Sequence, residues 1–175
     1  MSGFPALKDM TVETGLAWCL AALTFFEEAC RSGDIDQLQA AGIIGYGLHN
    51  LPQIILQLQE NKRSMYSVYG DMSHRSGNSQ TKAFTRSFFE QDIPAVALPQ
   101  DKVLPDTLAK AMYSTMQAFR VGFRPGNAFA TEEGWDERRQ DCLRMAIAIK
   151  THLRRWIADE QFDAEAFQRD GGWLQ

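Results

Sequence analysis

The stretch Gly15-Leu-Ala-Trp-Cys-Leu-Ala-Ala-Leu-Thr-Phe-Phe26 contains no charged side chain and is apolar on nearly every side of a helix. A helix that is hydrophobic all round lies in the middle of a bundle and not on its surface. Asp9 or Thr11 is suited to cap its start, and Gly33 follows its end, so we expect a helix over residues 10–31. The run is too short to span a bilayer. It therefore predicts a buried core helix around which the rest of the chain packs.

A second helical pattern covers residues from Asp34 or Asp36 to about Ser64. Its apolar stripe is spaced by steps of four and three: Ile44, Leu48, Leu51, Ile55 and Leu58. Pro52 lacks a backbone donor and its ring clashes one turn back, which predicts a kink or break near residues 48–52. Gly42, Gly45 and Gly47 each weaken a helix by about 1 kcal/mol relative to alanine. A segment that keeps them gains close helix packing, or consists of two helices with a bend.

The pattern of the remaining chain also predicts helices separated by turn-forming residues. Residues 70–81 are polar and predict a loop, and Pro94, Pro99 and Pro105 punctuate a connection long enough to wrap across the bundle. Helices are expected over about 82–91, 105–122, 132–159 and 163–169. The fold class is thus all-α: a single irregular bundle of four to five main helices with a Pro-rich crossover, forming one domain over residues 1–175.

Composition agrees with a globular domain that carries a slight excess of negative charge. The 175 residues are 45% hydrophobic and 23% charged, with a net charge of −4 and a pI of about 5.4. A domain of this size buries roughly 70% of its unfolded surface and needs no metal or disulfide for its core. Acidic residues dominate positions 1–60 and basic residues dominate positions 61–131. The net negative charge argues against a protein whose whole surface binds nucleic acid. The distribution of charge along the chain still permits a local basic patch.

The three cysteines, Cys19, Cys30 and Cys142, have neither the count nor the spacing of a disulfide framework or a zinc site. Reduced, buried thiols are typical of cytoplasmic proteins, so we expect a cytoplasmic location. Acidic residues flank the apolar run near the N-terminus where a signal peptide would carry a basic region and a cleavage site. A signal peptide removed before this chain begins stays an open alternative, and we expect no membrane association.

The glycine-bearing segment at residues 42–52 is the strongest candidate for a ligand or partner site. The glycines would let a backbone or ligand approach closely, with Tyr46, His49 and Asn50 beside it. His49 is the best single candidate because a neutral imidazole both donates and accepts a hydrogen bond near pH 7. The alternative is structural: the glycines serve helix packing, and His49 satisfies a carbonyl that Pro52 leaves free.

The polar loop at residues 70–81 offers a second candidate site. His74 and Arg75 stand among serines, which is typical of an anion-binding or partner-contact loop. The loop does not contain the glycine and lysine spacing of a P-loop. The alternative is an ordinary surface loop without a ligand.

A catalytic interpretation would need His49, His152 and Arg144 to meet in one cleft. Six basic side chains between positions 138 and 155 suit phosphate binding, or instead they pair with neighbouring acids and face solvent. His152 lies beside this basic face and is expected to be exposed. No two of His49, His74 and His152 have the spacing that places metal ligands on one helix face, so we expect no metal and no other cofactor.

These observations favour a small, acidic, soluble protein-binding module without catalytic activity: an adaptor, an inhibitor or an immunity-type protein. One alternative is a helical enzyme acting on nucleic acid or a nucleotide through His49, His152 and nearby arginines. Another is a homo-oligomeric structural subunit, joined through the glycine-bearing face. The expected partner is thus another protein or a second copy, and nucleic acid is not favoured.

Overall fold

The computed structural model describes residues 3–72, 75, 77–99, 102–125 and 132–171, and every regular element in these ranges is helical. A short 3-10 helix, Leu7–Asp9, precedes α1 (Val12–Ser32), α2 (Ile35–Leu48), α3 (Leu51–Gln59), α4 (Ser79–Phe89), α5 (Asp106–Phe123), α6 (Glu132–Ile157) and α7 (Ala164–Arg169). The predicted all-α bundle is confirmed. No helix in the described ranges is long and apolar enough to cross a bilayer.

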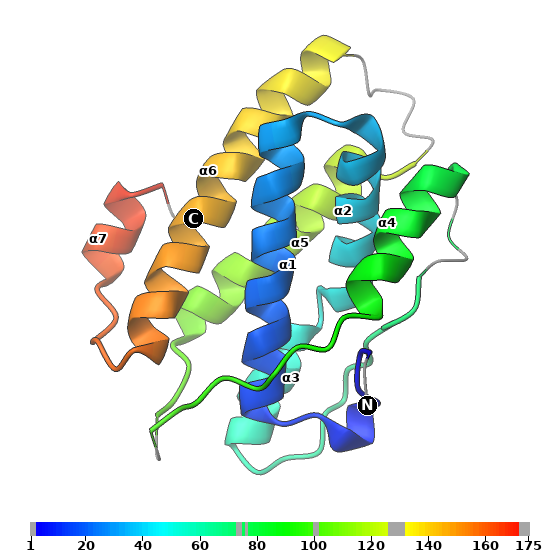
Figure 1. Ribbon diagram of the computed structural model, residues 1–175. Helices are drawn as coiled ribbons and strands as arrows, with labels where there is room; N and C mark the ends of the chain where they lie inside the picture. Colours follow the sequence, from blue (N-terminus) through cyan, green and yellow to red (C-terminus); the bar gives the residue numbers. More distant parts are fainter. Residues whose placement is uncertain (1–2, 73–74, 76, 100–101, 126–131, 172–175) are drawn as a thin grey trace.

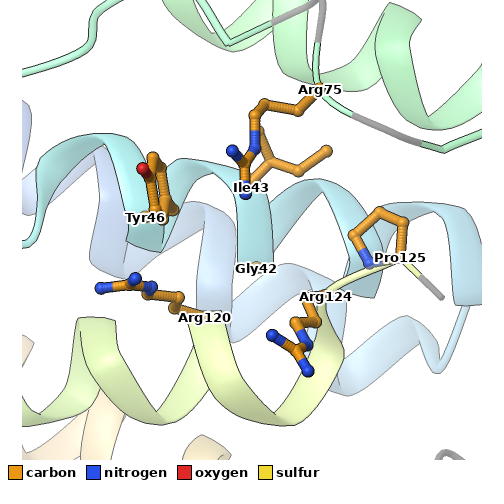
Figure 2. Close-up of a pocket in the computed structure, with 7 residues that line it drawn as sticks. All are labelled: Gly42, Ile43, Tyr46, Arg75, Arg120, Arg124 and Pro125. Carbon is orange, nitrogen blue, oxygen red and sulfur yellow. The ribbon is translucent and has the colours of Figure 1, made fainter. Parts of the chain in front are cut away.

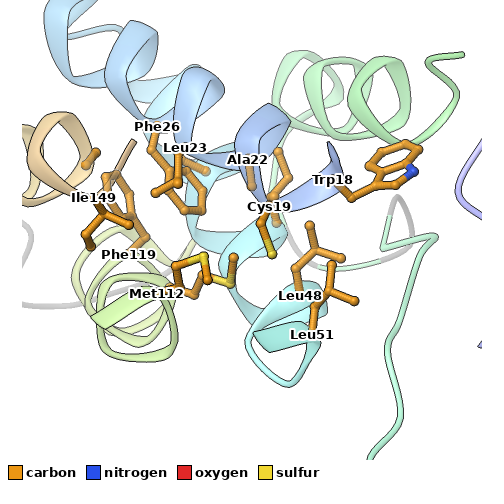
Figure 3. Close-up of a cluster of buried hydrophobic side chains, with 14 of the residues drawn as sticks. Trp18, Cys19, Ala22, Leu23, Phe26, Leu48, Leu51, Met112, Phe119 and Ile149 are labelled. Atoms are coloured by element: carbon orange, nitrogen blue, oxygen red, sulfur yellow. The ribbon is translucent and has the colours of Figure 1, made fainter. Parts of the chain in front are cut away.

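Helix α1 is the central element predicted from its apolar run. Its N-cap is Thr11, whose side chain accepts a hydrogen bond from the Thr14 amide at 3.1 Å, and Gly33 ends the helix with a φ of 68°. Figure 1 shows α1 in front of α5, between α6 and α4. Figure 3 shows its side chains meeting those of α2, α3, α5 and α6 in one core. Phe26 of α1 stacks on Phe119 of α5, with ring centres 4.1 Å apart.

The break predicted near Pro52 is present and divides the second segment into α2 and α3. Asp34 caps α2, and His49 and Asn50 lie between the two helices. Pro52 is the second residue of α3, where its missing amide hydrogen removes no intrahelical bond. The proline therefore starts a new helix and does not interrupt one.

Two of the three glycines of α2, Gly42 and Gly45, are buried against the backbone of α5, whereas Gly47 faces the Tyr69 carbonyl oxygen. A Cβ atom at Gly45 would lie 2.5 Å from the Met116 carbonyl oxygen, and one at Gly42 would lie 3.0 Å from the Phe119 oxygen. The predicted close approach of a backbone is thus α5 of the same chain. This face of α2 is covered within the bundle, so a homo-oligomer cannot use it without unpacking α5.

The Pro-rich connection between α4 and α5 crosses α1, as predicted. Figure 1 shows it running across the front of the N-terminal half of α1. The Val96 amide donates to the Glu13 carbonyl at 3.2 Å, and the Leu104 amide donates to the Gln59 side chain at 2.7 Å. These two bonds hold the crossover at Val96, beside α1, and at Leu104, beside the end of α3.

Candidate functional site

A cleft of about 250 Å³ opens between α2, the loop before α4 and the C-terminal end of α5. We call it the arginine cleft. The side chains that define it are Ile43, Tyr46, Arg75, Arg120, Arg124 and Pro125. Figure 2 shows Arg75 reaching it from one side and Arg120 and Arg124 from the other, with Tyr46 at one end.

Tyr46 organises the cleft because two guanidinium groups lie on its ring. The guanidinium carbon of Arg75 is 4.2 Å from the ring centre, and that of Arg120 is 4.5 Å away. Such cation–π contacts restrain a guanidinium through its face and leave its N–H edge available for hydrogen bonds. Tyr69 stacks beside the same ring, with the two ring centres 5.9 Å apart.

Two described residues near Arg75, Met72 and Asn78, are anchored to the bundle. Met72 is buried, and its carbonyl accepts a hydrogen bond from the Arg75 amide at 3.0 Å. Asn78 caps α4 and donates from its side chain to Asp36 of α2 at 2.7 Å. Arg75 is therefore placed against α2 by anchors that are not themselves part of the cleft.

Arg120 and Arg124 reach the cleft because the glycines of α2 let α5 come close. Arg120 lies in the last turn of α5 and Arg124 is the residue that caps this helix, so both side chains leave the same end of α5 and line the cleft. Arg120 also donates to the Gln117 side chain at 3.3 Å. A larger residue at Gly42 or Gly45 would push this end of α5 away from Tyr46.

Among the side chains that the structure describes, the three arginines of the cleft have no acidic partner, unlike several lysines and arginines elsewhere in the bundle. No carboxylate oxygen of a described side chain lies within 4.0 Å of Arg75, Arg120 or Arg124. By contrast, Lys150 of α6 bonds Glu27 of α1 at 2.8 Å. Three like charges around one opening repel one another, and an anion between them would relieve this repulsion.

His49 and Asn50, both predicted site residues, lie beside the arginine cleft and do not line it. The His49 Nδ1 atom is 2.6 Å from the Tyr46 carbonyl oxygen, which can only accept, so Nδ1 carries the proton and donates. Burial, followed by the charge of Arg120, lowers the pKa of His49, and the ring is neutral at pH 7. Asn50 donates to the Ser67 carbonyl at 3.0 Å and thereby holds the segment that leads to Tyr69.

His152 is buried, and the expectation that it faces solvent is wrong. Its side chain is 3% exposed because α7 folds back over α6 and brings Phe167 and Asp170 onto the ring. The Nε2 atom is 2.7 Å from the Asp170 carboxylate. Arg144, by contrast, is exposed, with its nearest carboxylate, Asp141, at 4.0 Å.

The histidines of the catalytic alternative lie in different surroundings. The ring of His49 contacts Tyr46 and Tyr113, whereas that of His152 contacts Phe162 and Phe167 of the α7 region. His74 lies outside the described residues. Of the predicted site residues that the structure describes, Tyr46 and Arg75 line the arginine cleft, and His49, Asn50, Arg144 and His152 do not.

Three of the six basic side chains on α6 donate hydrogen bonds to other groups of the protein. Arg139 donates to the Cys30 carbonyl and pairs with Asp136, Arg138 donates to the Gly122 carbonyl, and Lys150 pairs with Glu27. In the described part of the chain, no group of three histidine, cysteine, aspartate or glutamate side chains is arranged to hold a metal ion.

Comparison with known proteins gives no relative: no family model, curated protein or solved structure matches the chain. The site must therefore be interpreted from its own geometry. Sequence reasoning missed Arg120 and Arg124, although their four-residue spacing before Pro125 was a readable signal of two cations at one helix end. What the sequence did not show was which helix they would face.

Proposed function

We propose that the chain is a small protein-binding module without catalytic activity, which holds an acidic group of its partner in the arginine cleft. The observation that carries this proposal is the meeting of Arg75, Arg120 and Arg124 at one opening with no carboxylate within 4.0 Å among the described residues. Charge-assisted bonds between arginine and an oxyanion are about twice as strong as neutral hydrogen bonds.

The surroundings of the cleft favour a protein as the partner. Tyr69, which stacks on Tyr46, is 47% exposed, and the same segment presents Tyr66 at 42% and Met65 at 89%. Arginine, tyrosine and methionine are the side chains enriched at the centres of protein interfaces. An acidic group held in the cleft would bring the partner's neighbouring residues against this segment.

Two features disfavour nucleic acid or a whole nucleotide as the ligand. Proteins that bind single strands stack bases on open aromatic faces, but two guanidinium groups already lie on the Tyr46 ring. The cleft, at about 250 Å³, is also below the usual range of roughly 300–1,000 Å³ for small-molecule and cofactor sites. A single charged side chain fits these dimensions better.

The test is fluorescence anisotropy with a labelled library of acidic peptides with randomised flanks, together with a basic library and a single-stranded DNA oligomer. We expect the wild-type protein to bind the acidic library and the Arg75→Gln/Arg120→Gln variant to lose at least tenfold in affinity. Arg63→Gln removes one charge from an exposed site outside the cleft and should bind like the wild type. Equal binding by the double variant, or binding of the DNA alone, would overturn the proposal.

A further inference from the structure

We propose that the acidic group in the arginine cleft is a phosphate monoester on a side chain of the partner protein, an inference that rests on the proposed function. A carboxylate and a phosphate ester differ in charge, in number of acceptor oxygens and in the organic group attached. These three differences can be compared with the hydrogen-bond donors, the charge and the apolar side chains of the cleft.

The number of donors exceeds what a carboxylate needs. One guanidinium satisfies a carboxylate through two parallel hydrogen bonds. Arg75, Arg120 and Arg124 each present up to five N–H donors, less the bond that Arg120 gives to Gln117. A phosphate monoester has three free oxygens and accepts from several guanidinium groups at once, so it makes use of all three arginines.

The positive charge of the cleft also favours a phosphate monoester over a carboxylate. Three guanidinium groups meet at the cleft without an acidic partner among the described residues. A carboxylate supplies one negative charge, whereas a phosphate monoester carries about −1.5 to −2 near pH 7. The dianion therefore compensates more of the repulsion between the arginines.

The apolar part of the lining distinguishes an ester from free phosphate. Ile43, Pro125 and the ring edge of Tyr46 border the same space as the guanidinium groups. Figure 2 shows Ile43 and Pro125 beside the arginines, where they could contact the carbon atoms of a bound side chain. Inorganic phosphate would leave these surfaces without a contact.

The placement of the arginines before any ligand binds favours recognition. Tyr46 restrains Arg75 and Arg120 through their guanidinium groups, and the Arg75 amide is bonded to the Met72 carbonyl. Binding then costs less side-chain entropy than the ordering of free surface arginines would. The arginine side chains are therefore positioned to bind an oxyanion before the ligand arrives.

The experiment compares four randomised peptide libraries whose central residue is phosphotyrosine, phosphoserine, glutamate or serine. We expect a phosphorylated library to bind wild-type protein at least tenfold more tightly than the glutamate library. Arg75→Gln and Arg124→Gln should each reduce this preference, and Arg75→Lys should reduce it partly, since lysine keeps the charge but not the planar fork. Arg63→Gln is the control, and thermal unfolding identifies any variant that fails to fold.

The outcomes separate this inference from the function on which it rests. Equal binding of the glutamate and phosphorylated libraries would overturn the phosphate inference and leave the acidic-partner function standing. Binding of none of the acidic libraries would overturn both. Displacement of the phosphopeptides by inorganic phosphate at the same concentration would show a free-phosphate site, and stronger displacement by adenosine monophosphate a nucleotide site; either result would also overturn the inference.

Discussion

Substitution of Gly45 by alanine tests the close packing that brings α5 to Tyr46. The added Cβ would lie 2.5 Å from the Met116 carbonyl oxygen, whereas ordinary contact begins at 3.4 Å, so one helix must move by most of an ångström. Overpacking of this kind lowers the free energy of unfolding by about 1–3 kcal/mol. Because the obstacle at Gly45 is a backbone atom that cannot rotate away, we expect a cost of about 3 kcal/mol for this substitution. Alanine regains about 1 kcal/mol of helix propensity. The net expectation is a loss of about 2 kcal/mol, which lowers the Tm of a chain this size by about 4–8 °C.

Gly122→Ala on α5 is the matched control for this substitution. Its Cβ would meet the Cδ atom of Arg138, which is a side chain and not a backbone, and the loss of the Arg138 bond to the Gly122 carbonyl is offset by about 1 kcal/mol of helix propensity that alanine gains. The Tm of this variant should stay close to that of the wild type in circular dichroism melts. A Gly45→Ala protein as stable as the wild type would refute the close contact and with it the placement of Arg120.

Three further results are expected. Replacing Glu27 by Gln should lower stability by roughly 1 kcal/mol in urea unfolding, because the 2.8 Å bond from Lys150 that joins α1 to α6 loses its charge; unchanged stability would contradict this. The hydrogen bond from His152 holds the pKa of Asp170 below its usual range, so this contact contributes stability at neutral pH and loses it only as the pH falls below that range. The protection factors of the α7 amides against hydrogen exchange should fall in that pH range, and also at pH 7 in Asp170→Asn; unchanged protection would contradict a stabilising contact between His152 and Asp170. Burial raises the pKa of the Cys19 thiol to about 12, so alkylation at pH 8 should require unfolding; rapid labelling of the native protein would show that the core opens.

The fold was largely predictable because its signals are local. The apolar run of α1, the cap at Thr11 and the glycine at position 33 all act within a few residues, and the structure confirms each of them. The break near Pro52 followed from the ring clash of proline, and the structure adds that the proline sits in the first turn of α3. Each of these features is determined by the types of a few neighbouring residues, which the sequence gives.

The candidate site was less predictable because it depends on pairing between distant segments. Tyr46 and Arg75 were named as candidates, but nothing local joins them to Arg120, which reaches Tyr46 only because the α2 glycines admit α5. The exposure expected for His152 failed for a similar reason. Its helical position faces a short element, α7, whose return across α6 is not encoded near residue 152.

The most direct test of the arginine cleft is an NMR titration of the Arg Nε–Hε signals with phenyl phosphate, a small monoester with an aromatic carbon group. If Arg75, Arg120 and Arg124 hold one anion together, their three signals will shift along a single saturating curve while that of Arg63 stays in place. Signals that do not move, or that move equally at Arg63, would contradict the claim that these arginines form a binding site.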